Sequence, residues 1–108
     1  TTLNSIGSVY DNLGQRDKAL QYYELALPIR QEVGDRSGEA VTRFNIAMIL
    51  RRQGELERSI AELRCVVALD ELVQHPDLEQ DRAVLAKVEE EWRKQQQPKT
   101  PWWRFWEK

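Results

Sequence analysis

Few residues of this chain have the types and spacing that catalysis or metal binding requires. The chain contains one histidine, His75, and one cysteine, Cys65, whereas a zinc site needs three or four Cys, His or carboxylate ligands placed together. His75 precedes Pro76, as in a turn, and we interpret it as a loop residue. Cys65 lies beside Val66 and Val67, and we expect it to be a buried, small apolar group. A single cysteine cannot form a disulfide within the chain.

Carboxylates are the remaining candidates for chemistry, and they form two clusters. One holds Asp77, Glu79 and Asp81, and the other runs from Glu89 to Glu91. Catalytic carboxyl groups need burial in a shared cleft, because such surroundings shift their pKa values. Both clusters lie on one amphipathic segment, so we expect all six groups to be solvated. Glycine-rich phosphate loops and nucleophile motifs are absent from the sequence. We therefore expect no enzymatic activity, no cofactor and no metal.

Composition narrows the class of protein further. Apolar residues make up 41% of the 108 residues, and the 16 basic and 18 acidic residues give a net charge of -2. That balance argues against nucleic acid as a partner, since its binders usually carry a strong basic excess. The sequence has no apolar run of the length that spans a membrane. Thr1 stands inside an apolar pattern where a Met would be expected, so we expect a piece of a longer, cytoplasmic protein.

The chain repeats itself at a period of 40 residues. What recurs is mainly the size and polarity of the side chains, as a packing unit requires. Identical aligned positions include Thr2 and Thr42, Ile6 and Ile46, Gly14 and Gly54, and Val33 and Val73.

Each unit of the repeat predicts a pair of helices. Apolar residues at three- and four-residue spacing run from Leu3 to Leu13, and Gly14 ends that helix. Asp17 is expected to cap the next helix, and Pro28 to kink it. A turn over residues 34–38 leads to the second unit, with helices near residues 39–53 and 56–74. Small apolar positions, above all Gly7 and Ala47, are expected where the two helices of a pair approach closely.

A fifth helix is predicted from Asp77 to about Gln96. Asp77 and Gln80 have the spacing of a capping box. Its apolar residues make one narrow stripe, and its other faces are charged, as in the terminal cap of a helical solenoid. The stripe consists of Val84, Leu85, Val88 and Trp92, and the pairs Glu89/Arg93 and Glu90/Lys94 have favourable four-residue spacing.

These residues together resemble the tetratricopeptide repeat family. The signature is a large residue, a small one and an aromatic, followed in the second helix by a small residue, an aromatic and a small residue. It reads Ile6, Gly7, Tyr10, Ala19, Tyr23 and Ala26 in the first unit, and more loosely Ile46, Ala47, Leu50, Ser59, Leu63 and Val66 in the second. The spacing is similar to the 40-residue variant found in bacterial signalling and scaffold proteins and in kinesin light chains. Two features depart from the family pattern: each second helix lacks the Pro expected near its end, and only two full repeats are present.

The resemblance implies an all-α fold, an α-α superhelix of two helical hairpins and a C-terminal capping helix. Its parts would be repeat 1 (residues 1–36), repeat 2 (37–76), the cap (77–96) and an aromatic tail (97–108). The family also implies a concave groove that is lined mainly by the first helix of each pair and binds a protein or peptide.

The candidates for partner binding lie on the faces of these first helices that are not used for packing. Asn side chains can bond a peptide backbone, and Arg can form two bonds to a carboxylate. Phe44 and Met48 stand out as apolar groups on a polar face, although packing against the fifth helix is a competing explanation. The full set is Asn4, Ser8, Asp11, Asn12, Phe44, Asn45, Met48, Arg51 and Arg52.

The C-terminal tail holds four large aromatic residues in five positions: Trp102, Trp103, Phe105 and Trp106. Such a cluster favours association when it is exposed. Three interpretations are open: docking in an apolar groove of this chain or of a second copy, insertion into a membrane interface beside Lys and Arg, or an unstructured recognition motif or remnant. The sequence thus predicts a protein-interaction module, with self-association or membrane tethering through the tail as the alternative.

Overall fold

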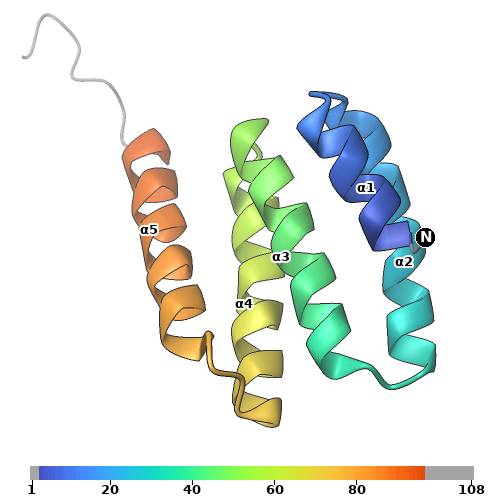
Figure 1. Cartoon of the computed structure of the whole chain (residues 1–108). Helices are drawn as coiled ribbons and strands as arrows, with labels where there is room; N and C mark the ends of the chain where they lie inside the picture. The colour runs from blue at the N-terminus through green and yellow to red at the C-terminus, as the bar shows by residue number, and fades with distance from the viewer. Residues whose placement is uncertain (1–2, 97–108) are drawn as a thin grey trace, which may run out of the picture.

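The computed structural model describes residues 3–96, which form five α-helices (Figure 1). These are α1 (Leu3–Asn12), α2 (Arg16–Glu32), α3 (Arg36–Arg52), α4 (Leu56–Val73) and α5 (Leu78–Gln96). Each helix packs against the next along the chain. In Figure 1, α1 and α3 stand on the viewer's side with α2 and α4 behind them, and α5 lies beside α4. The predicted all-α architecture of two hairpins and a fifth helix is confirmed. The aromatic tail lies outside the described residues.

Four turns of one form set the lengths of the first four helices. Gly14, Gly34, Gly54 and Gln74 follow one another at intervals of 20 residues, and all have a positive φ, between 54° and 81°. The residue after each donates its backbone N–H to the carbonyl five positions earlier, an arrangement that satisfies the free carbonyls at a helix end. The pairs are Gln15 to Tyr10, Asp35 to Arg30, Glu55 to Leu50 and His75 to Asp70. Two such units make the 40-residue period of the sequence.

The helix starts differ from the sequence predictions. Gln15 occupies the cap position of α2, so the prediction that Asp17 caps this helix is wrong, and Asp17 lies in its first turn. Helix α3 begins three residues earlier than predicted, at Arg36, because the carboxylate of Asp35 accepts a hydrogen bond from the Gly38 N–H at 2.8 Å.

The start of α5 lacks the predicted capping box. The Asp77 N–H donates to Nδ1 of His75 at 3.0 Å, so the imidazole fills the role expected of Gln80.

Two apolar clusters hold the five helices together. The first joins the hairpins and consists of Ala19, Tyr23, Ile46, Ile49 and Leu50. The second joins the second hairpin to α5 and consists of Ala47, Leu56, Ile60, Leu63 and Val88. The stripe of Val84, Leu85, Val88 and Trp92 therefore faces the core, as the sequence predicts.

Small residues allow the two helices of each hairpin to approach closely. A Cβ atom added to Gly7 would lie 2.9 Å from the ring of Tyr23. In the second hairpin the hydroxyl of Ser59 donates to the carbonyl of Ala47 at 2.8 Å, and both residues are fully buried. The expected close-packing sites Gly7 and Ala47 are confirmed.

The prediction of a buried Cys65 is wrong. Leu63 and Val66 turn into the core, whereas Cys65 lies on the opposite side of α4 and is exposed. The spacing of three to four residues between inward positions explains this placement. Within residues 3–96, the helices lack the length and apolarity needed to cross a membrane.

Candidate functional site

The first helix of each pair and the fifth helix present a common surface, the α1–α3–α5 face. Several of the predicted partner-binding residues use their polar groups to join these helices to one another. The Thr42 hydroxyl of α3 donates to Oδ1 of Asn4 in α1 at 3.0 Å. Nearer the other end of the same two helices, Arg52 pairs with Asp11 at 3.1 Å. These groups therefore hold the two repeats together.

On this face, an ion pair joins α3 to α5. The guanidinium of Arg51 forms two hydrogen bonds to the carboxylate of Glu91, one of them 3.0 Å long. These bonds lower the pKa of the Glu91 carboxyl and raise that of Arg51.

The apolar candidates Phe44 and Met48 pack against the second cluster, next to Val84, Leu85 and Trp92 of α5. The competing explanation from the sequence, packing against the fifth helix, therefore accounts for both residues.

Three candidates remain available on this face. Ser8 is exposed, and its hydroxyl lies beside the phenol of Tyr23, whose pKa is raised by burial despite this contact. Asn12 is exposed and Asn45 is half-buried. Neither amide takes part in a side-chain hydrogen bond within the part of the chain that the structure describes. These two Asn side chains are free to bond a ligand.

A hollow of about 350 Å³ opens between the first halves of α3 and α5. We call it the acidic pocket, because its ionisable lining consists of three aspartates and one histidine. Its size falls at the lower end of the range for small-ligand pockets, roughly 300–1,000 Å³. The lining residues are Ala40, Val41, Phe44, Asp70, His75, Asp77, Gln80, Asp81 and Val84.

Asp70 is the least expected residue of the acidic pocket. It is 0% exposed, and its carboxylate oxygens have no hydrogen-bond donor within the described residues apart from the Asp81 carboxyl when that group holds a proton. Such a buried, unpaired charge is costly unless a proton or a cation neutralises it. Burial and the adjacent Asp70 carboxyl, with a further contribution from Asp77, raise the pKa of Asp81 to about 7. A proton retained on Asp81 thus reduces the repulsion between the two carboxyl groups.

The carboxylate clusters therefore differ from the sequence expectation at one member. Glu79 is exposed and pairs with Arg82, and Glu89, Glu90 and Glu91 pair with Arg64, Lys94 and Arg51. Asp81, in contrast, is half-buried against Asp70, so the prediction that it is simply solvated is wrong. Asp70 was not predicted from the sequence as a site residue, although its spacing from the buried Leu63 and Val66 is that of an inward-facing position.

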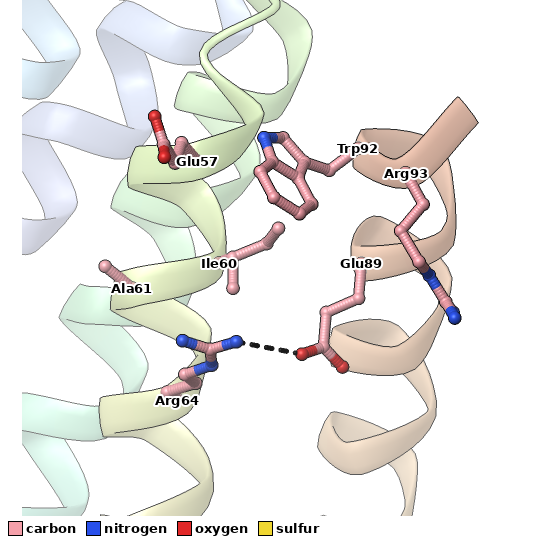
Figure 2. Close-up of a pocket in the computed structure, with 7 residues that line it drawn as sticks. All are labelled: Glu57, Ile60, Ala61, Arg64, Glu89, Trp92 and Arg93. Carbon is pink, nitrogen blue, oxygen red and sulfur yellow. Dashed lines mark hydrogen bonds and ion pairs between the residues drawn. The ribbon is translucent and has the colours of Figure 1, made fainter. Parts of the chain in front are cut away.

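A second hollow, of about 520 Å³, lies between α4 and the last turns of α5 (Figure 2). We call it the Trp92 hollow. Figure 2 shows Ile60 and the indole of Trp92 between the two helices, with Arg64 bonded to Glu89 below them. Glu89 thus bonds across to α4, where the sequence predicted a pair with Arg93 on its own helix. The remaining lining residues are Glu57, Ala61 and Arg93.

Two further features bear on what this surface can bind. Among residues 3–96, no group of three or more His, Cys, Asp or Glu side chains is arranged to hold a metal ion. Leu25 and Ile29 of α2 and Val33 at its C-terminal cap are exposed apolar residues at four-residue spacing. They form an apolar stripe along the second helix of the first repeat.

Comparison with known proteins gives one match. A family model described as a tetratricopeptide repeat matches residues 1–71. The searches of curated proteins and of solved structures gave no match. The matched residues include all of α1 to α3 and most of α4, whose paired helices and close-packing glycine and alanine sites are described above. The chain belongs to the tetratricopeptide repeat family.

Proposed function

We propose that this chain is a protein-interaction module that binds a peptide or helix of a partner protein on its α1–α3–α5 face. Membership of a family of generally non-catalytic interaction modules supports a role without enzymatic activity. The observation that carries the proposal is the free surface of α3, where Val41 is 49% exposed and the Asn45 amide makes no bond within the described residues. An apolar side chain and a free amide on a rigid helix suit an extended or helical peptide.

The wider setting is a further part of the proposal. The 40-residue spacing resembles repeats of bacterial signalling and scaffold proteins, and we place the chain in such a protein, in the cytoplasm. There it would act by holding a partner, with the helices serving as a rigid support.

The test is selection of binding peptides from a random library, followed by mapping of the bound peptide by amide NMR shifts. We expect the shifted amides to lie on α1 and α3. Asn45→Arg should abolish binding, because a longer charged side chain would occupy the peptide's path. Gln21→Arg makes the same change on the exposed side of α2 and should leave binding unchanged. Peptides that map to α2, or that bind Asn45→Arg normally, would refute the proposal.

The second proposed function is self-association through the Trp-rich segment. The observation in its favour is the Trp92 hollow, which has an apolar wall of Ile60, Ala61 and Trp92 beside the end of α5 (Figure 2). The sequence Trp102, Trp103, Phe105 and Trp106 follows shortly after that helix. Burial of each large aromatic side chain contributes about 1.5–3 kcal/mol. A second copy could supply the aromatic residues that fill this hollow.

Deletion of residues 98–108 tests the second function. We expect the deletion to lower the molar mass measured by light scattering, at low and at high salt, because apolar burial persists in salt. Trp92→Ala in the full chain should weaken association as well. An unchanged mass would contradict self-association. Binding to anionic vesicles that weakens with salt would instead favour membrane tethering.

A further inference from the structure

The acidic pocket holds the buried side-chain oxygens of residues 3–96 that lack a hydrogen-bond donor, those of Asp70. Its lining holds three aspartates but no Lys or Arg. Nδ1 of His75 accepts a hydrogen bond from the Asp77 N–H. The site therefore combines an acidic lining with the unpaired, fully buried carboxylate of Asp70.

Two arginines on the same helices are engaged elsewhere. Arg82 of α5 bonds to Glu71 at 2.7 Å and to Glu79 at 2.9 Å. Arg43 of α3 bonds to Glu39 at 3.0 Å and to Glu62 at 2.9 Å. A proton on Asp81, or a cation that a partner supplies, would balance the charge of the pocket.

The shape and the remaining lining of the pocket indicate which kind of cation fits. The lining is divided between apolar side chains, those of Val41, Phe44 and Val84, and the adjacent carboxyl groups of Asp70 and Asp81. An arginine side chain has the same division, since a three-carbon stem carries a planar guanidinium that can bond two carboxylates at once. An aromatic ring in the wall adds a favourable contact for the guanidinium.

We propose that the acidic pocket binds an arginine side chain of the partner protein, with its stem against Phe44 and its guanidinium between Asp70 and Asp81. This inference rests on the proposed function, because the pocket opens beside the free surface of α3. It adds that the partner presents a basic residue next to the segment that lies along α3. The arginine takes the place of the proton on Asp81, so binding releases that proton.

Proton release makes the binding depend on pH. The groups that face Asp81 are Asp70 of α4 and His75 and Asp77 of the connection, while α3 contributes only Ala40, Val41 and Phe44. Binding of the guanidinium should tighten about tenfold between pH 6 and pH 8, as expected when one proton near pH 7 must leave.

The experiment uses the full chain and amide NMR titration with N-acetyl-arginine amide. The matched probe is N-acetyl-citrulline amide, which has nearly the same shape but no charge. We expect the arginine probe to give saturable shifts at Ala40, Val41, Phe44 and Gln80, and the citrulline probe to bind at least about tenfold more weakly. A lysine probe should bind more weakly than arginine, since its ammonium lacks the planar fork.

Variants assign the effect to the buried carboxyl group. Asp70→Asn should weaken the arginine probe about tenfold or more, and Asp81→Asn serves the same purpose if Asp70→Asn unfolds. Glu79→Gln removes one charge from the same helix outside the pocket and should leave binding unchanged. Equal binding of arginine and citrulline, shifts that avoid the pocket, no saturable shift, or an unaffected Asp→Asn variant would overturn the inference. Library peptides that still bind the surface of α3 would then show that the proposed function survives.

Discussion

The two ends of α5 are attached to the repeats by opposite electrostatics. Near its C-terminal end, Glu91 bonds to Arg51 of α3 and Glu89 bonds to Arg64 of α4, so each carboxylate has a cationic partner. Near its N-terminal end, Asp81 lies against the buried Asp70, and no cation of the described residues reaches either one. The C-terminal end of α5 is thus attached through pairs of opposite charge, whereas its N-terminal end places two carboxyl groups next to each other.

The difference separates stability from binding. Exposed or half-exposed ion pairs contribute little to stability, at most about 1 kcal/mol each, but they fix the position of α5. The contact between Asp70 and Asp81 destabilises the folded state. It persists because apolar packing along the middle of α5 contributes more stability than this contact costs. A group that destabilises the free protein yet lines a pocket is a reasonable sign of a binding site.

The largest expected effect comes from disrupting the second apolar cluster, which packs α5 against the second hairpin. Leu63 is fully buried in the cluster beneath α5. Leu63→Ala should lower the free energy of unfolding by about 2–5 kcal/mol, because it removes buried methyl groups and leaves a cavity. Leu72→Ala is the matched control, since Leu72 is 59% exposed on the same helix. Urea unfolding followed by circular dichroism measures both. Similar losses of stability for the two variants would contradict the claim that this cluster holds α5 against the second hairpin.

The next effect isolates the acidic end through pH. Asp81 has a pKa of about 7 in the folded chain, against an ordinary aspartate pKa of 3.8, so the folded state binds more protons between these values. Stability should therefore fall as pH rises from about 4 to about 7 and stay low above that. We expect a loss on the order of 1–2 kcal/mol, below the full linkage value because Asp81 is partly exposed.

Asp81→Asn should remove this pH dependence, because the amide does not titrate. Glu79→Gln should retain it. Thermal unfolding at pH 5 and pH 8 is the measurement. A wild-type chain that is equally stable at both pH values would contradict the claim that the two ends of α5 differ in their electrostatics.

The smallest effect belongs to the paired end. Glu91→Gln should cost about 0.5–1 kcal/mol at low salt, and less at high salt. Because the pKa of Glu91 is lowered, its contribution is present above the ordinary glutamate pKa and is lost as pH falls through the folded value. Glu90→Gln breaks only the exposed four-residue pair with Lys94 and should cost less still. A loss for Glu90→Gln that equals that for Glu91→Gln would mean that the contact with Arg51 has no special weight.

Periodicity predicted most of the fold because packing along the helices depends on residue size alone. Gly7, Ala47, Ala19 and Ser59 are small where the hairpins close, and their spacing is visible in the sequence. Helix starts were less predictable. Asp35 precedes α3 and bonds to a backbone N–H of that helix, whereas Asp17 lies inside the first turn of α2, after the cap residue Gln15.

The candidate site was predictable only in part. The sequence singled out Phe44, which does line the acidic pocket. The contact between Asp70 and Asp81 could not be predicted from the sequence, because it depends on how α5 packs back against α4. The same is true of Asn4, Asp11 and Arg51, whose predicted availability depended on neighbours from other helices.

A pH titration of the carboxyl carbons by NMR tests the central claim most directly. We expect the Asp81 carboxyl to titrate near pH 7 and the Glu91 carboxyl to titrate below the ordinary glutamate value. Saturating N-acetyl-arginine amide should move the Asp81 step to lower pH, because a ligand that binds the deprotonated form favours it, and N-acetyl-citrulline amide should not. If Asp81 titrates near 4 in the free chain, or if its step stays in place when the arginine probe is added, the acidic end is not an arginine site.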